Sequence, residues 1–202
     1  MRRLRPGSEA EMVALFLRTE LSSERFGDDL RALLERAGLP ERVVTDPDLD
    51  GDAENQARLR LLTEHRGYGT RTEVFEDFPD DVGWQWMVIT AAELARVRYI
   101  EYDYWVGLSG GTRLAVDAAR RIRAGRTQFG VPNGRVLSMA RAVAGGARFP
   151  PLILVTTGLG DELVVLEGHV RLTAYMLARD QMPAELEILV GSSPAMTHWG
   201  CW

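Results

Sequence analysis

The chain has 202 residues, 46% of them apolar and 26% charged, which is typical of a soluble globular protein with one domain or one extended domain. All 24 basic residues are arginines, because the sequence contains no lysine. This excludes a P-loop lysine, the strand lysine of protein kinases and any Schiff-base chemistry. An anion would have to be held by arginine, by backbone N–H groups or by a metal.

The net charge of −5 argues against non-specific DNA binding by the whole molecule. The charge is unevenly distributed, since residues 46–81 hold eleven acids and four arginines, and residues 110–160 hold eight arginines and one acid. Such asymmetry favours either an anionic ligand at the basic segment or two faces that pair with each other.

A single cysteine, Cys201, excludes a disulfide framework and a cysteine-based zinc site, and it favours a reducing compartment. The basic start of the chain is followed by Ser8 and Glu11 instead of an apolar signal core. No apolar run reaches the length of a membrane span. These features predict a cytoplasmic protein with no membrane partner, and they leave its oligomeric state open.

Helical periodicity and capping signals predict that the first half of the chain is mainly helical. Ser8 and Glu11 form a capping box that opens the first helix. Beyond it we expect a helix over 26–37 ended by Gly38, a helix over 53–66 ended by Gly67, a strand over 84–89, and a short helix opened by a second capping box, Thr90 with Glu93.

The second half reads as helices followed by short apolar strands between glycines. We expect a helix over 113–124 capped by Thr112, a helix over 134–144 capped by Asn133, strands over 152–155 and 163–166, a helix over 169–179 and a strand over 186–190. The predicted fold class is α+β, with a mainly helical annex over residues 1–104 and a core over residues 105–202 that ends in a tryptophan-containing tail.

The best candidate site is the strand-to-helix junction Glu167-Gly168-His169-Val170-Arg171. The first N–H groups of a helix have no partner within it, and its dipole is positive at that end. Gly168 would let a phosphate approach the backbone, and Arg171 would add a charged contact. The alternative is plain architecture, in which Glu167 caps backbone N–H groups, His169 closes the turn and Arg171 pairs with a nearby acid.

The surroundings of this junction add a family resemblance. A proline-led run over 149–155, a hairpin, the run over 165–175 and the step Met182-Pro183 follow one another after a helix that ends near Gly146. This succession resembles the ParB/sulfiredoxin superfamily over about residues 113–191. The resemblance implies a ParB/sulfiredoxin-like core with nucleotide phosphates at Gly168.

The resemblance implies several activities, and the residues present separate them. Sulfiredoxins place a cysteine where this chain has His169, and ParB-type partition proteins continue into a helix-turn-helix domain. Free-serine kinases of the superfamily have an acidic residue beside a glycine–histidine turn, which Glu167-Gly168-His169 resembles, although Val170 replaces a second histidine. The resemblance leaves the reaction open, and the enzyme hypothesis is phosphotransfer from ATP to a small hydroxyl substrate, or nucleotide hydrolysis, with Mg²⁺.

In that reaction Gly168 and Arg171 would hold the phosphates, and Glu167 would act as general base or as a magnesium ligand through water. His169 would contact phosphate or transfer a proton. A second glycine-rich turn supplies further candidate ligand contacts: Ser109, Thr112 and Arg113. No direct metal-binding residues are predicted, and the sequence leaves open whether the protein is an enzyme.

Other interpretations stay open. The arginine-rich segment allows a DNA-binding or nuclease-like regulator, and a non-catalytic interaction or antitoxin-like module is a third hypothesis. Residues 46–51 resemble the first half of a calcium loop, but Ala57 stands where that loop needs a bidentate glutamate, so a solvated loop before the helix is expected. The tail with Trp199, Cys201 and Trp202 is expected to dock by its tryptophans.

Overall fold

The structure is a computed structural model that describes residues 1–70 and 72–202. Its elements in chain order are β1 (Arg2–Pro6), α1 (Glu9–Leu21), α2 (Gly27–Arg36), α3 (Arg42–Thr45), α4 (Asp52–Arg66), η1 (Glu73–Phe75), β2 (Gly83–Thr90), α5 (Ala91–Leu94), α6 (Asp103–Ser109), α7 (Ala115–Arg123), α8 (Gly134–Ala144), β3 (Leu152–Thr156), β4 (Val164–Glu167), α9 (His169–Leu177), β5 (Glu185–Ser192) and η2 (Pro194–His198). The fold is mixed α+β, as predicted.

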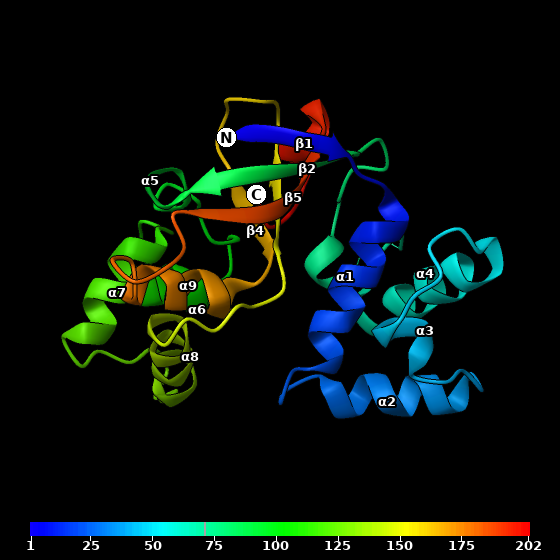
Figure 1. Cartoon of the computed structure of the whole chain (residues 1–202), viewed down its shortest axis with the longest axis horizontal. Coiled ribbons are helices and arrows are strands. Elements are labelled where there is room, and N and C mark those ends of the chain that lie inside the picture. The colour runs from blue at the N-terminus through cyan, green and yellow to red at the C-terminus, as the bar shows by residue number, and fades with distance from the viewer. Residues whose placement is uncertain (71) are drawn as a thin grey trace.

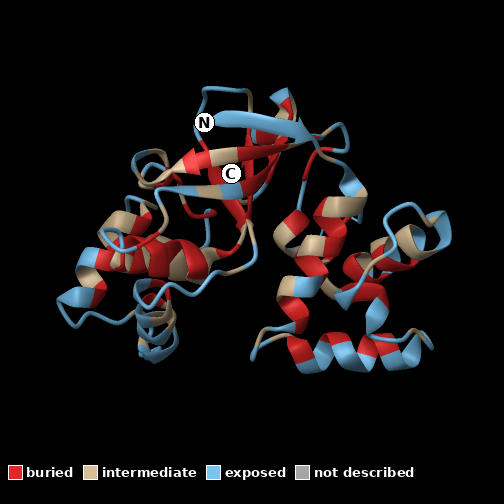
Figure 2. Cartoon of the chain, in the orientation of Figure 1, coloured by how far each residue is buried: buried red, intermediate tan, exposed pale blue. Residues whose placement is uncertain are grey.

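Five strands form one mixed sheet in the order β1-β2-β5-β3-β4. β3 and β5 are parallel, and the other neighbouring pairs are antiparallel. In Figure 1 the helices α1–α4 gather on one side of the view and α6–α9 on the other, and the sheet joins the two groups. β1 is exposed along its whole length, whereas most of α9 is buried (Figure 2).

Each face of the sheet supports its own apolar core. Side chains alternate along a strand, so Trp84 and Trp86 of β2 pack with α1, α2 and α4, while Met87 and Ile89 pack with α7, α8 and α9. The same alternation divides the side chains of β3 and β5 between the two cores. The sheet thereby holds the N-terminal helices and the C-terminal helices in a fixed arrangement.

Most helix boundaries agree with the sequence prediction. Both capping boxes form, at Ser8 with Glu11 and at Thr90 with Glu93. α4 ends at Arg66, because Gly67 adopts a left-handed conformation with φ of 77°. The helix predicted from Arg113 begins instead at Ala115.

The late start of α7 has a local cause. Arg113 has a positive φ of 60°, a conformation outside the helical region. Thr112 does not cap this helix as predicted, because its hydroxyl accepts from the Leu114 N–H and donates to Asp117. The prediction also missed β1, α3 and α6, since short or fully exposed elements have little apolar periodicity.

The sheet spans the sequence division predicted at residue 104. Two of its strands, β1 and β2, come from the first hundred residues, and β2 pairs with β5 over its whole length. The helices α1–α4 are therefore tied to the core through a shared sheet as well as through side-chain packing. Within the part of the chain that the structure describes, no helix is long and apolar enough to cross a membrane.

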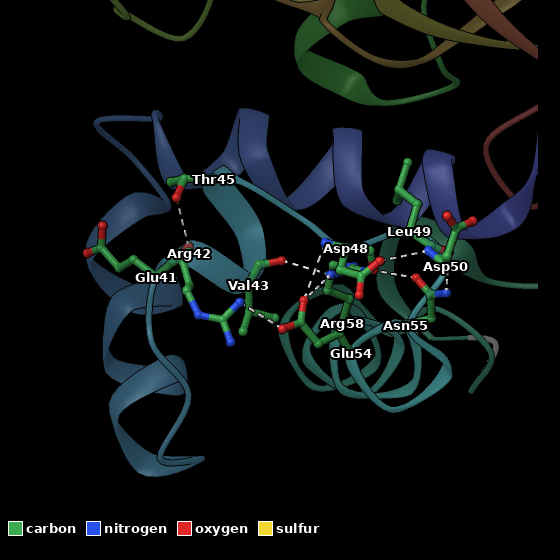
Figure 3. A network of polar contacts seen from close by, with 10 residues as sticks. All are labelled: Glu41, Arg42, Val43, Thr45, Asp48, Leu49, Asp50, Glu54, Asn55 and Arg58. Atoms are coloured by element: carbon green, nitrogen blue, oxygen red, sulfur yellow. Dashed lines mark hydrogen bonds and ion pairs between the residues drawn. The ribbon is translucent and has the colours of Figure 1, made fainter.

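The loop before α4 is organised by a buried arginine. Arg58 is fully buried, and its guanidinium donates to the carbonyl oxygens of Val43, at 3.0 Å, and Asp48, at 2.7 Å. The same group also contacts the side chains of Glu54 and Asn55 (Figure 3). Arg58 thus holds the loop through the Asp48 backbone carbonyl, while the Asp48 side chain accepts a hydrogen bond from the Asp50 N–H within the loop.

Candidate functional site

The predicted junction forms as expected between β4 and α9. β4 ends at Glu167, Gly168 has a left-handed φ of 108°, and α9 begins at His169. A Cβ atom at Gly168 would lie 2.4 Å from a methyl carbon of Leu152 and 2.9 Å from a guanidinium nitrogen of Arg171. The position therefore requires glycine both for its backbone conformation and for the space around it.

Substitution of this glycine gives a direct test of the turn. We expect Gly168→Ala to lower the free energy of unfolding by about 2–4 kcal/mol, combining left-handed strain with steric overlap. Gly160 is a matched control, because it has a φ of 101° with no atom within 4 Å of an added Cβ. Gly160→Ala should cost only about 1 kcal/mol in urea unfolding. Equal losses in the two variants would contradict the close approach at Gly168.

Glu167 is a carboxyl group in an enclosed position. Its side chain is 15% exposed, and its Oε1 lies 3.4 Å from a guanidinium nitrogen of Arg171. Burial raises its pKa to about 7, and the Glu20 charge acts in the same direction against the opposing charges of Arg171 and Arg66. A carboxyl that titrates near neutral pH has the basicity that a general base needs.

Arg171 is a buried residue of the first turn of α9, and its guanidinium forms hydrogen bonds with other groups of the protein. Its side chain is 5% exposed. The guanidinium donates to the Pro150 carbonyl, at 3.0 Å, and to the Thr19 hydroxyl, at 3.4 Å, as well as to Glu167. Burial lowers the pKa of Arg171. In this arrangement Arg171 positions Glu167 and connects α9 to α1.

His169 is held in an aromatic stack. Its ring lies nearly parallel to that of Trp105, with centroids 5.1 Å apart, and near the ring of Tyr99. Burial lowers its pKa to about 3, helped by the charges of Arg66 and Arg171. The ring is thus neutral near pH 7, and its buried Nε2 has no hydrogen-bond partner. A neutral imidazole ring can form one hydrogen bond with a ligand through Nε2, but it contributes no positive charge to the site.

The aromatic residues near position 100 divide between packing and exposure. Tyr99 is fully buried, and its hydroxyl shares a 2.6 Å hydrogen bond with that of Thr173 on α9. Tyr102 is 52% exposed. Core packing therefore explains Tyr99 and Trp105.

The N-terminal helices bring additional polar side chains close to the junction, and these were not predicted from the sequence. Glu20 on α1 lies 3.1 Å from His65 Nε2 on α4, and both side chains are almost completely buried. Arg66 follows at the end of α4. Burial raises the pKa of Glu167 and the charge of Arg66 opposes this rise, whereas burial lowers the pKa of His169 and the charge of Arg66 lowers it further. The sequence marks Arg66-Gly67 only as a helix end, because the electrostatic interaction of Arg66 with Glu167 depends on the tertiary fold.

The second glycine-rich turn uses its polar groups locally. Ser109 donates to backbone carbonyls of α6 and accepts from the Arg113 N–H. Arg113 donates to the carbonyls of Tyr99 and Trp202 and pairs with Glu101. Among the described residues, no hydrogen bond of Ser109, Thr112 or Arg113 reaches the Gly168 turn. Their predicted ligand contacts remain a prediction, and α6 approaches the turn through Trp105 instead.

Comparison with known proteins leaves the family open. No protein-family model, curated protein or solved structure matches this chain. The ParB/sulfiredoxin resemblance and the functions that it implies therefore stay predictions. The arginine-rich segment lies on α7, α8 and their flanking loops, with most of its arginines exposed, and its nucleic-acid reading likewise stays a prediction.

The tail docks as expected. Trp199 is 2% exposed and donates its indole N–H to the Val74 carbonyl at 2.7 Å. Burial raises the pKa of the Cys201 thiol. A raised pKa keeps the thiol protonated and unreactive near neutral pH.

Proposed function

We propose that the chain binds a nucleotide or another small phosphorylated ligand at the Gly168 turn and that Glu167 acts there as a general base. The observation that carries this proposal is Glu167 itself, a carboxyl with a pKa near 7 next to the first N–H groups of α9. The resemblance to ParB/sulfiredoxin-like cores supports the same position for the phosphates. A helix N-terminus attracts anions by its dipole and by its unpaired donors.

The proposed reaction is phosphoryl transfer from ATP to a small hydroxyl substrate. The Glu167 carboxylate accepts the hydroxyl proton, and the substrate oxygen forms a bond to the terminal phosphorus. The bond from that phosphorus to the bridging oxygen breaks, and ADP leaves with the electron pair. Water in place of the hydroxyl substrate gives nucleotide hydrolysis by the same steps.

Magnesium would enter with the nucleotide. Among the described residues, no group of three or more histidine, cysteine, aspartate or glutamate side chains is arranged to hold a metal. The phosphate oxygens and water would then supply most of its ligands, as is common for Mg²⁺ in phosphoryl transfer. Glu167 is the carboxylate of the turn that would accept a bond from a magnesium-bound water.

The experiment is a thermal-shift screen of nucleotides and inorganic pyrophosphate, with and without Mg²⁺, followed by ATP turnover. We expect at least one nucleotide to raise the melting temperature of the wild type, since a ligand that binds only the folded state stabilises it. Glu167→Gln should bind that nucleotide but turn over ATP at least about one hundredfold more slowly. Glu187→Gln, an exposed change on β5, is the control.

Each part of the proposal has its own contrary result. If no nucleotide or pyrophosphate stabilises the wild type, the ligand site is wrong. If wild-type turnover persists in Glu167→Gln, the general-base role is wrong while binding stands. Binding without any turnover in the wild type would identify a non-catalytic ligand-binding module.

A further inference from the structure

The guanidinium of Arg171 is already engaged by groups of the protein itself. Three acceptors already engage its guanidinium: Pro150, Thr19 and Glu167. A phosphate that took these donors would leave buried acceptors without partners, at a cost that offsets much of the new contact. A cation that meets the ligand without breaking these hydrogen bonds would come from another element.

α1 brings the end of α4 to the junction. Thr19 accepts from Arg171 on the core side, and the next residue, Glu20, pairs with His65 on the other side. The Gly168 turn and the last turn of α4 thus flank the same turn of α1. Arg66 is the residue that follows His65, and it ends the helix.

Arg66 differs from Arg171 in what its side chain contacts. Its guanidinium carbon lies 4.5 Å from the ring centre of Phe26. Stacking on an aromatic face supports the guanidinium but leaves the N–H donors at its edge free. Among the described residues Arg66 has no hydrogen-bond or ion-pair partner, and its buried Nε is unsatisfied.

Two residues that interact electrostatically at the junction each have a buried polar atom without a partner. These atoms are Nε of Arg66 and Nε2 of His169, and the charge of Arg66 acts on His169 more strongly than any other charge does. Buried polar atoms are nearly always hydrogen-bonded in native proteins, so an unsatisfied pair marks a position that a ligand or ordered water completes. A phosphate offers oxygen acceptors to an arginine donor and to a neutral imidazole N–H alike.

We propose that Arg66 is the anion-binding arginine of the Gly168 turn, so that a bound phosphate is contacted by the N-terminal helices and by the core together. This inference rests on the proposed ligand site and adds the residue that recognises the anion. The His65–Glu20 pair acts as a positioning pair, since it fixes the last turn of α4 against α1. The N-terminal helices are then part of the binding site.

The test compares three arginine variants with ATP and inorganic pyrophosphate as probes in calorimetric titration. Arg66→Ala should weaken binding about tenfold to one hundredfold, because it removes charge-assisted hydrogen bonds. Arg66→Lys should bind with an affinity between those of the wild type and Arg66→Ala, since lysine keeps the positive charge but lacks the forked donors of the guanidinium. Arg25→Ala is the matched control: Arg25 also lies over Phe26, at 4.7 Å, but it is exposed.

The outcomes separate this inference from the proposed function. If Arg66→Ala and Arg25→Ala both bind ATP as the wild type does, Arg66 is not the anion contact, although the site remains. If the wild type binds neither probe nor any nucleotide of the screen, both proposals fail. Circular dichroism shows whether Arg66→Ala folds. If it does not, Arg66→Gln and Arg66→Lys are titrated in the same way. Wild-type affinity in both of these variants would overturn the inference.

Discussion

Glu167→Gln is expected to stabilise the folded protein at neutral and alkaline pH and to give no such gain in acid. Burial raises the pKa of Glu167 from 4.5 to about 7, so the folded chain keeps this proton to higher pH than the unfolded chain does. The contribution of Glu167 to the free energy of unfolding is therefore complete below about pH 4.5 and is lost as the pH rises through about 7. Glutamine cannot ionise and avoids this loss.

His169 changes stability in the opposite direction. Its pKa falls from 6.5 to about 3 on folding, mainly through burial, so its stabilising contribution is present above about pH 6.5 and is lost as the pH falls towards 3. Between about pH 4.5 and 6.5 the two contributions change with opposite slopes and largely cancel in the wild type. Glu167→Gln removes one of them and exposes the other.

The measurement is urea unfolding of wild type and Glu167→Gln at several values from about pH 5 to pH 8. The difference in the free energy of unfolding, variant minus wild type, should rise by about 1–3 kcal/mol over this range, since one unit of pKa shift corresponds to about 1.4 kcal/mol. Glu187→Gln, which changes an exposed carboxyl on β5, is the control for removing one carboxylate. The same difference for Glu167→Gln at both ends of the range would contradict the buried, proton-retaining carboxyl.

Local signals in the sequence predicted the elements that carry them. The capping boxes at Ser8 and Thr90 and the left-handed glycine after α4 are short-range features, and each defines a helix end in the structure. β1 could not be found this way, because its five residues are all exposed and mostly arginine. Its place at the edge of the sheet depends on pairing with β2, about eighty residues further on.

The candidate site shows the same division between local and long-range information. The Glu167-Gly168-His169 turn lies at one strand-to-helix junction, so the sequence alone located it. The role of Arg171 was visible only as a charge in the first turn, whereas its contact with Thr19 shows that it serves the packing of α9 on α1. Arg66 acts electrostatically on Glu167 and His169 from about one hundred residues away in the sequence, and a single sequence contains no signal for that interaction.

Arg58→Ala is expected to cause a large loss of stability, about 3–5 kcal/mol. The change removes the donors for two backbone carbonyls, those of Val43 and Asp48, and for the side chains of Glu54 and Asn55 (Figure 3). It also leaves a cavity, because Arg58 is the largest of the fully buried side chains. Unsatisfied buried acceptors and lost packing add in the same direction.

Two further variants separate hydrogen bonding from charge in urea unfolding. Arg60→Ala alters an exposed arginine of the same helix and should change stability by no more than about 0.5 kcal/mol. Arg58→Lys keeps the charge but concentrates three donors on one nitrogen, so it cannot reach acceptors that the guanidinium serves with two. A loss in Arg58→Lys close to that in Arg58→Ala would show that the forked geometry holds the loop, whereas full stability in Arg58→Lys would show that positive charge alone suffices.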